Sequence, residues 1–117
     1  MNTCLFCSIV AGEIPADIVR RTDRSVAFRD VHPQAPVHVL VVPVVHHPDA
    51  ASMAGDPEAL GLLMADAVAV AKEQGLAPDG ESRGYRLVLN TGAGAGQSVF
   101  HTHVHVLGGR GFTWPPG

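Results

Sequence analysis

The sequence has little charge, few cysteines and no long apolar run, and each shortage narrows the class of protein. Charged residues make up 16% of the 117 residues, and the net charge is −3 with histidine neutral. Because nucleic-acid-binding domains usually carry a basic excess or stripe, no nucleic-acid partner is expected. No apolar stretch approaches the ~18 residues that a transmembrane helix needs, so no membrane partner is expected either.

The N-terminal segment and the two cysteines favour a cytoplasmic protein. The segment lacks the cationic leader of a signal peptide, and the two cysteines are Cys4 and Cys7. In a reducing compartment these thiols are not expected to form a structural disulfide. An apolar content of 46%, without repeats or low-complexity blocks, is typical of a globular chain. We expect a single domain over residues 1–117.

Apolar periodicity predicts two helices and five strands. A short helix is expected over residues 5–11, and a long one over 57–74, where Asp56 suits the N-cap and Gly75 the end. Strands are expected over residues 18–21, 25–29, 38–42, 85–90 and 99–107. One long helix between two groups of strands favours an α+β fold with a mainly antiparallel sheet.

Three of the seven histidines, His101, His103 and His105, alternate along the last predicted strand. Alternate residues of a strand lie on one face, with neighbours roughly 7 Å apart and the outer two roughly 13 Å apart. The three rings can line one groove. They cannot easily all bind one small ion, because zinc–nitrogen bonds are only about 2 Å long. At least two roles are therefore expected among the three residues.

A glycine-rich loop, TGAGAGQS, comes directly before this strand. Glycines let a backbone approach a ligand closely and turn its N–H groups toward an anion. A flexible hairpin is the alternative interpretation. Since the loop leads straight to the histidines, an anion held there would lie against imidazole rings.

Three segments resemble one known family. GQSVFHTHVHVLGGR resembles the His-φ-His-φ-His-φ-φ signature of the histidine-triad (HIT) family, in which φ is apolar. FRDVHPQAPVHVLVVP and the terminal WPPG resemble the Hint branch, the histidine-triad nucleotide-binding proteins. The resemblance runs over residues 4–117. It departs from the pattern at Thr102, whose side chain should face away from the histidine groove, and in the longer connection APDGESRGY.

The resemblance implies a HIT-like fold: a five-stranded, mainly antiparallel sheet, one long and one short helix, and a sheet continued across a two-fold homodimer. It also implies binding of purine nucleoside monophosphates and hydrolysis of their phosphoramidates, with His103 as the nucleophile. A neutral imidazole can attack phosphorus and leave a nucleotidyl-imidazole, which water then hydrolyses. We expect one ring nitrogen of His103 to face phosphorus while the other donates to a backbone carbonyl.

Further residues are expected around the phosphate, to contact its oxygens, help protonate the departing amine or support the histidine network. They are His38, Asn90, Gly96, Gln97, Ser98 and His105. Asn90 is assigned by the resemblance alone. For His38, a satisfied core histidine is the alternative.

The nucleoside end of the pocket is expected at Asp30, whose carboxylate can accept hydrogen bonds from both ribose hydroxyls. A turn aspartate before a proline-containing loop is the alternative. By the resemblance, apolar side chains sandwich the purine base and discriminate loosely between adenine and guanine. They are Phe6, Ile9, Phe28 and Val31.

The pair Cys4-x-x-Cys7 is a common half of a zinc site. Two buried reduced thiols are the alternative. Some relatives carry these cysteines and bind a structural zinc with two histidines, which match His46 and His101 here, with His47 as the alternative to His46. In that arrangement His101 would serve the metal while the other two histidines of the triad serve the phosphate. No catalytic metal is expected.

Other functions stay open at this point. Nucleotidyl transfer or dinucleoside polyphosphate hydrolysis belongs to the same superfamily, although WPPG argues against both by resemblance. A metallohydrolase could use His103 and His105 around zinc, but no convergent carboxylate is obvious, since Asp30 is better explained by ribose. A non-enzymatic nucleotide-binding adaptor is the third alternative.

Overall fold

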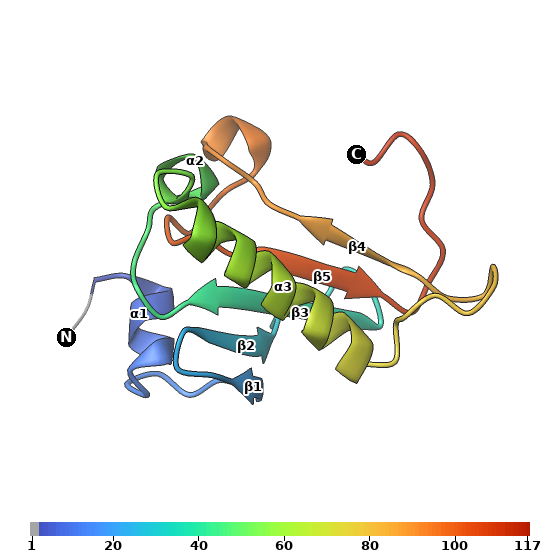
Figure 1. Ribbon diagram of the computed structural model, residues 1–117, viewed down its shortest axis with the longest axis horizontal. Helices are drawn as coiled ribbons and strands as arrows, with labels where there is room; N and C mark the ends of the chain where they lie inside the picture. The colour runs from blue at the N-terminus through green and yellow to red at the C-terminus, as the bar shows by residue number, and fades with distance from the viewer. Residues whose placement is uncertain (1–2) are drawn as a thin grey trace.

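The computed structural model describes residues 3–117 and contains one five-stranded antiparallel sheet in the order β1-β2-β3-β5-β4. The strands are β1 (Ile18–Arg21), β2 (Ser25–Arg29), β3 (Val37–Pro43), β4 (Tyr85–Val88) and β5 (Val104–Gly108). The helices are α1 (Leu5–Val10), α2 (Ala50–Met53), α3 (Pro57–Glu73) and the short 3-10 helix η1 (Ala93–Ala95). The predicted α+β class with a mainly antiparallel sheet is confirmed (Figure 1).

The long helix α3 begins and ends where its sequence signals predict. The Asp56 side chain accepts a hydrogen bond from the amide of Ala59, and Pro57 occupies the first turn, where no intrahelical donor is needed. Gly75 follows the C-cap with a φ of 77°, a conformation that glycine adopts without steric cost. The helix lies across one face of the sheet (Figure 1).

The strands alternate between two apolar clusters, one on each face of the sheet. In β3, Val39 and Val41 pack toward α3, whereas Leu40 and Val42 pack on the other face with Phe6 of α1. The second face is also the one on which His38 and His105 lie, because both share the alternation of Leu40. The functional side chains therefore gather on the face of the sheet away from α3.

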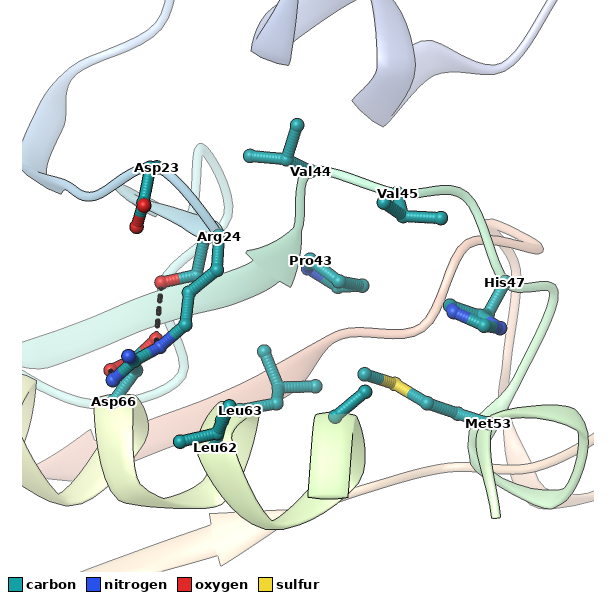
Figure 2. Close-up of a pocket in the computed structure, with 12 residues that line it drawn as sticks. Asp23, Arg24, Pro43, Val44, Val45, His47, Met53, Leu62, Leu63 and Asp66 are labelled. Carbon is teal, nitrogen blue, oxygen red and sulfur yellow. Dashed lines mark hydrogen bonds and ion pairs between the residues drawn. The ribbon is translucent and has the colours of Figure 1, made fainter. Parts of the chain in front are cut away.

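An ion pair with a buried carboxylate fixes α3 to the turn between β1 and β2. Asp66 is 2% exposed, and its carboxylate accepts two hydrogen bonds from the Arg24 guanidinium, at 2.7 and 3.1 Å, and one from the Ser25 hydroxyl at 2.7 Å. Burial alone would raise the pKa of Asp66, but the hydrogen bonds from Arg24 and Ser25 lower it. Figure 2 shows this pair at one end of a small pocket that continues along Leu63 to Met53.

The prediction of a strand over residues 99–107 is wrong at its start, since β5 begins only at Val104. The partner strand ends at Pro43, which has no amide hydrogen for a further rung of the ladder. Thr102 instead donates its amide and its hydroxyl to the carbonyl of His47, at 2.7 and 3.2 Å. The Thr102 side chain, 1% exposed, is thus turned to the connection after β3.

The end of β4 and the presence of α2 also differ from the prediction. β4 ends at Val88 and leaves Asn90 outside the strand. The short helix α2, capped by the side chain of Asp49, was not predicted, because four residues are too few for a helical period. Over residues 3–117, no helix is long and apolar enough to span a bilayer.

Candidate functional site

Of the two ring nitrogens of His103, Nδ1 is hydrogen-bonded, whereas Nε2 has no hydrogen-bond partner among residues 3–117. Its Nδ1 lies 2.8 Å from the carbonyl oxygen of His101. Because a carbonyl can only accept, Nδ1 carries the proton and Nε2 of the neutral ring keeps its lone pair. The expected backbone acceptor for His103 is therefore present. The Phe6 ring lies edge-on to His103 at 5.1 Å between centroids and limits the orientation of the imidazole.

His105, whose ring centroid lies 4.9 Å from that of His103, belongs to a hydrogen-bonded chain with His38 and Gln34. The amide of Gln34 donates to His38 Nδ1 at 3.0 Å, so the neutral His38 ring carries its proton on Nε2. That nitrogen lies 2.9 Å from His105 Nδ1 and 3.4 Å from the Asp30 carboxylate. If Nε2 of His38 donates, His105 Nδ1 must accept, and the proton of neutral His105 lies on Nε2. His38, 6% exposed, is thus both a satisfied buried histidine and the partner of His105.

Burial keeps these rings neutral. It lowers the pKa of His105 to about 4, with the neighbouring His103 and His38 lowering it further and Asp30 opposing the shift. Burial also lowers the pKa of His38, again against the carboxylate of Asp30. Near neutral pH, His105 is therefore an uncharged donor at Nε2.

The sequence offers no obvious carboxylate that converges on the triad, but the structure places Asp30 beside His105. A carboxylate oxygen of Asp30 lies within 4.8 Å of ring nitrogens of His38 and His105, on the same face of the sheet. The turn interpretation of Asp30 is also correct, since its Oδ1 accepts the amide of His32 at 2.8 Å. One carboxylate oxygen thus holds the turn, and the other is directed to the histidines.

A pocket of about 660 Å³ opens beside His103 and His105. It is lined by eight of the residues predicted for nucleotide binding: Phe6, Ile9, Phe28, Asp30, Val31, Ser98, His103 and His105. Nine further lining residues were missed, because nothing in their local pattern distinguishes them: Leu5, Ile14, Pro15, Ala16, Asp17, Arg29, His32, Leu40 and Val99. The pocket is mostly apolar at its α1 end and polar at the histidines.

Four residues predicted around the phosphate lie outside the lining of this pocket: His38, which contacts His105, and Asn90, Gly96 and Gln97. The Gln97 side chain is 3% exposed and accepts the Gly92 amide at 2.9 Å while donating to the carbonyls of Pro48 and Val99. It holds the glycine-rich loop closed on itself and on the connection before α2. Of the loop, Ser98 reaches the pocket.

A second cluster joins residues from opposite ends of the chain. Cys4 and Cys7 Sγ lie 3.3 and 3.4 Å from His101 Nδ1, and Cys7 Sγ lies 3.4 Å from His46 Nδ1. The two imidazole Nδ1 atoms are 3.0 Å apart, and all four donor atoms lie within 4.8 Å of one another. His47 is not part of the cluster; its ring lines the pocket on the α3 side instead (Figure 2).

The tautomer of His101 suits a metal ligand. Its Nε2 lies 2.8 Å from the Pro43 carbonyl, so Nε2 carries the proton and the lone pair of Nδ1 faces the two sulfur atoms. Cys4 caps α1 by accepting the Cys7 amide, which sets the two thiols side by side. Without a cation, desolvation and the neighbouring Cys4 raise the pKa of Cys7 to about 11. Two sulfurs and two imidazoles form a closed, soft donor set that fits a tetrahedral ion.

Known proteins resemble this chain over nearly its full length. The HIT domain profile matches residues 11–112. The purine nucleoside phosphoramidase of Escherichia coli (strain K12) is 43% identical over 107 residues, which are 91% of this chain and 87% of the relative. A HIT family hydrolase from Legionella pneumophila Philadelphia 1 superimposes with a TM-score of 0.90 at 45% identity, covering 98% of this chain and 100% of the other. A zinc-bound histidine triad family protein from Mycobacterium smegmatis gives a TM-score of 0.79 at 32% identity, covering 92% and 76%.

Proposed function

This chain belongs to the HIT family, and from that premise we propose that it hydrolyses purine nucleoside phosphoramidates through a covalent nucleotidyl-histidine at His103. One observation carries the proposal: the Nδ1 proton of His103 is held by the His101 carbonyl, so the lone pair of Nε2 is available in the pocket. The name of the Escherichia coli relative, a purine nucleoside phosphoramidase at 43% identity, supports the substrate class.

In the first step, His103 Nε2 attacks phosphorus and the bond between phosphorus and the amine nitrogen breaks. The amine leaves with a proton taken from the Ser98 hydroxyl or from water. In the second step, water attacks phosphorus and the bond between phosphorus and His103 Nε2 breaks, which releases the nucleoside monophosphate and restores the neutral His103 ring. The proton that the water loses returns to Ser98 or passes to bulk water, whichever gave the proton in the first step. Each displacement puts negative charge on the phosphate oxygens, and the Nε2–H of His105 is the donor that faces this charge.

The rest of the pocket fits the nucleoside. The apolar walls at Phe6, Ile9 and Phe28 can stack on a purine without hydrogen bonds to its edges. The pocket should therefore accept both adenine and guanine. The Asp30 oxygen that is not used by the turn can accept a ribose hydroxyl. Ser98 can donate to the phosphate from the glycine-rich loop.

We also propose a structural zinc held by Cys4, Cys7, His46 and His101. The closed set of four donors leaves no position for substrate, so the ion would cross-link α1 to the segment before β5 and take no part in bond breaking. The zinc-bound relative from Mycobacterium smegmatis supports the choice of ion. His103 Nε2 is not among these donors, and it is left for phosphorus.

The test is mass spectrometry of protein quenched during turnover of an adenosine phosphoramidate. We expect an AMP adduct on a peptide containing His103, and its absence in His103→Asn. A metallohydrolase that used His105 and Asp30 would lose its activity after exhaustive chelation, and it would form no adduct. Turnover close to wild type in His103→Asn would overturn the mechanism.

A further inference from the structure

The loop between β2 and β3 is held at Gln34 from two sides. Its amide donates to His38 Nδ1 at 3.0 Å, on the side of the pocket. Its carbonyl accepts a hydrogen bond from Arg110 Nε at 3.1 Å, on the side of the C-terminal segment. One residue thus connects the end of β5 to the histidines through its backbone alone.

The close approach of Arg110 depends on the glycine before it. Gly109 has a φ of 88°, and a Cβ at this position would lie 2.9 Å from the Cβ of Pro36. The chain can therefore fold across the loop only with glycine here, because both the conformation and the contact exclude a side chain. The Arg110 guanidinium then also stacks over the Phe112 ring, at 4.3 Å from the centroid.

The Gln34 amide decides which histidine nitrogens carry protons. Since an amide N–H can only donate, it requires a lone pair on His38 Nδ1 and directs the His38 proton to Nε2. That proton meets His105 Nδ1 at 2.9 Å, which leaves His105 protonated on Nε2. If the amide moved away, His38 could take the other tautomer. His105 Nδ1 would then no longer have to accept a hydrogen bond from His38, and the His105 proton would no longer be confined to Nε2.

We infer that Arg110 is a positioning residue for the histidine chain: by holding the Gln34 carbonyl, it keeps the Gln34 amide on His38 Nδ1 and so keeps the His105 proton on Nε2. Arg110 touches neither substrate nor reacting atoms, and it acts through the loop. Its effect on turnover rests on the proposed phosphoramidase function, whereas its effect on the tautomers does not.

Arg86 provides a matched control. Its guanidinium also stacks over Phe112, at 5.0 Å from the ring centroid, and it donates to the Thr113 carbonyl. It therefore shares with Arg110 the charge and the contact with the C-terminal segment, but it makes no hydrogen bond to the loop between β2 and β3 among those found in residues 3–117. Replacing Arg86 loosens the same segment without releasing Gln34.

The experiment measures the ring nitrogens of His38 and His105 by ¹⁵N NMR of histidine-labelled protein at neutral pH, in wild type, Arg110→Ala and Arg86→Ala. We expect Nε2–H tautomers of both rings in wild type and in Arg86→Ala, and a shift toward a mixture in Arg110→Ala. Loss of one hydrogen bond of about 1 kcal/mol corresponds to roughly fivefold, so kcat for an adenosine phosphoramidate should fall about fivefold with little change in KM. Arg110→Met, which keeps the aliphatic stem, replaces Arg110→Ala if the latter does not fold.

Unchanged ring nitrogens in both Arg110 variants would overturn the inference, as would an equal shift in Arg86→Ala. A tautomer shift in a protein that forms no AMP adduct and hydrolyses no phosphoramidate would support the role of Arg110 and overturn the proposed function. Normal adduct formation with unchanged tautomers in Arg110→Ala would support the proposed function and overturn the role of Arg110. The two claims therefore fail separately.

Discussion

The carbonyl oxygen of His101 accepts the Nδ1 proton of His103 at 2.8 Å, while the His101 side chain faces the two cysteines. The residue that would bind the metal is thus the residue that orients the proposed nucleophile. Phe6 makes a second link, because it lies between Cys4 and Cys7 in the chain and contacts the His103 ring at 5.1 Å. The cluster of two cysteines and two histidines and the pocket are thus linked through one backbone carbonyl and one aromatic ring.

Removing both thiols should release the metal and lower thermal stability. In Cys4→Ser/Cys7→Ser, the zinc content of untagged protein, measured by elemental analysis, should fall from about one ion per chain to none. Serine does not replace thiolate in such a site. The link through His101 also predicts a loss of phosphoramidase rate, about tenfold, with kcat affected more than KM. Metal-free wild-type protein whose melting temperature ignores added zinc would contradict the site.

Asp30 should distinguish ribonucleotides from 2′-deoxyribonucleotides. Asp30→Asn keeps an oxygen for the His32 amide, so the turn is preserved, but it removes the charge that accepts a ribose hydroxyl. Loss of a charge-assisted hydrogen bond of about 1.5–3 kcal/mol should weaken AMP roughly 10- to 150-fold and 2′-deoxy-AMP much less. Isothermal titration calorimetry with both ligands checks this. Equal weakening of the two would leave Asp30 as a turn residue only.

Stability should decrease as the pH falls below about 6.5. The pKa of His105 is about 4 in the folded protein, against about 6.5 for an unfolded histidine, so between these values the unfolded chain binds more protons. The unfolding free energy therefore rises with pH through this window, and the contribution of His105 is fully present above it. Burial lowers the pKa of His38 and His101 as well, with the same sign. Calorimetry across the window checks the slope, and His105→Gln should reduce it; a melting temperature independent of pH would contradict the neutral, buried rings.

Among the polar residues on the α3 side of the sheet, replacement of Asp66 should lower the stability most. Asp66→Ala leaves the Ser25 hydroxyl and the half-exposed Arg24 guanidinium without their partner and should destabilise the fold by about 1–3 kcal/mol in urea unfolding. Glu73→Ala is the control, because its ion pair with Arg20 is half exposed and should cost less than about 1 kcal/mol. Since the pKa of Asp66 is lowered, its contribution is present at neutral pH and is lost only below about pH 4. Equal costs for the two variants would contradict this assignment.

A two-fold homodimer that continues the sheet stays a prediction. β4 lies at the end of the strand order, so one of its edges has no partner strand among the described residues. Light scattering should give twice the chain mass of 12.2 kDa. Trp114 is 82% exposed, and removal of residues 112–117 should alter the preference for the amine leaving group more than AMP affinity. A monodisperse monomer would contradict the predicted assembly.

The sequence by itself determined the elements whose signals are local. The capped helix α3, the hairpin of β1 and β2, and the central strand β3 lie within a residue or two of the predicted bounds, because apolar period, caps and prolines act on neighbouring residues. The same local reasoning failed before Val104, where alternation typical of a strand continues but Pro43 ends the partner. The family signature also led to the pocket, since eight predicted residues line it.

Only the tertiary structure decided which histidine has which partner. The contact between Cys4 and His101 joins residues 97 positions apart, and the choice of His46 over His47 depends on how the chain turns after β3. Likewise, Asp30 meets His38 and His105 because three strands place them on one face. Hydrogen-bond partners fix the tautomer of each ring, and partners distant in sequence are brought together only by the fold.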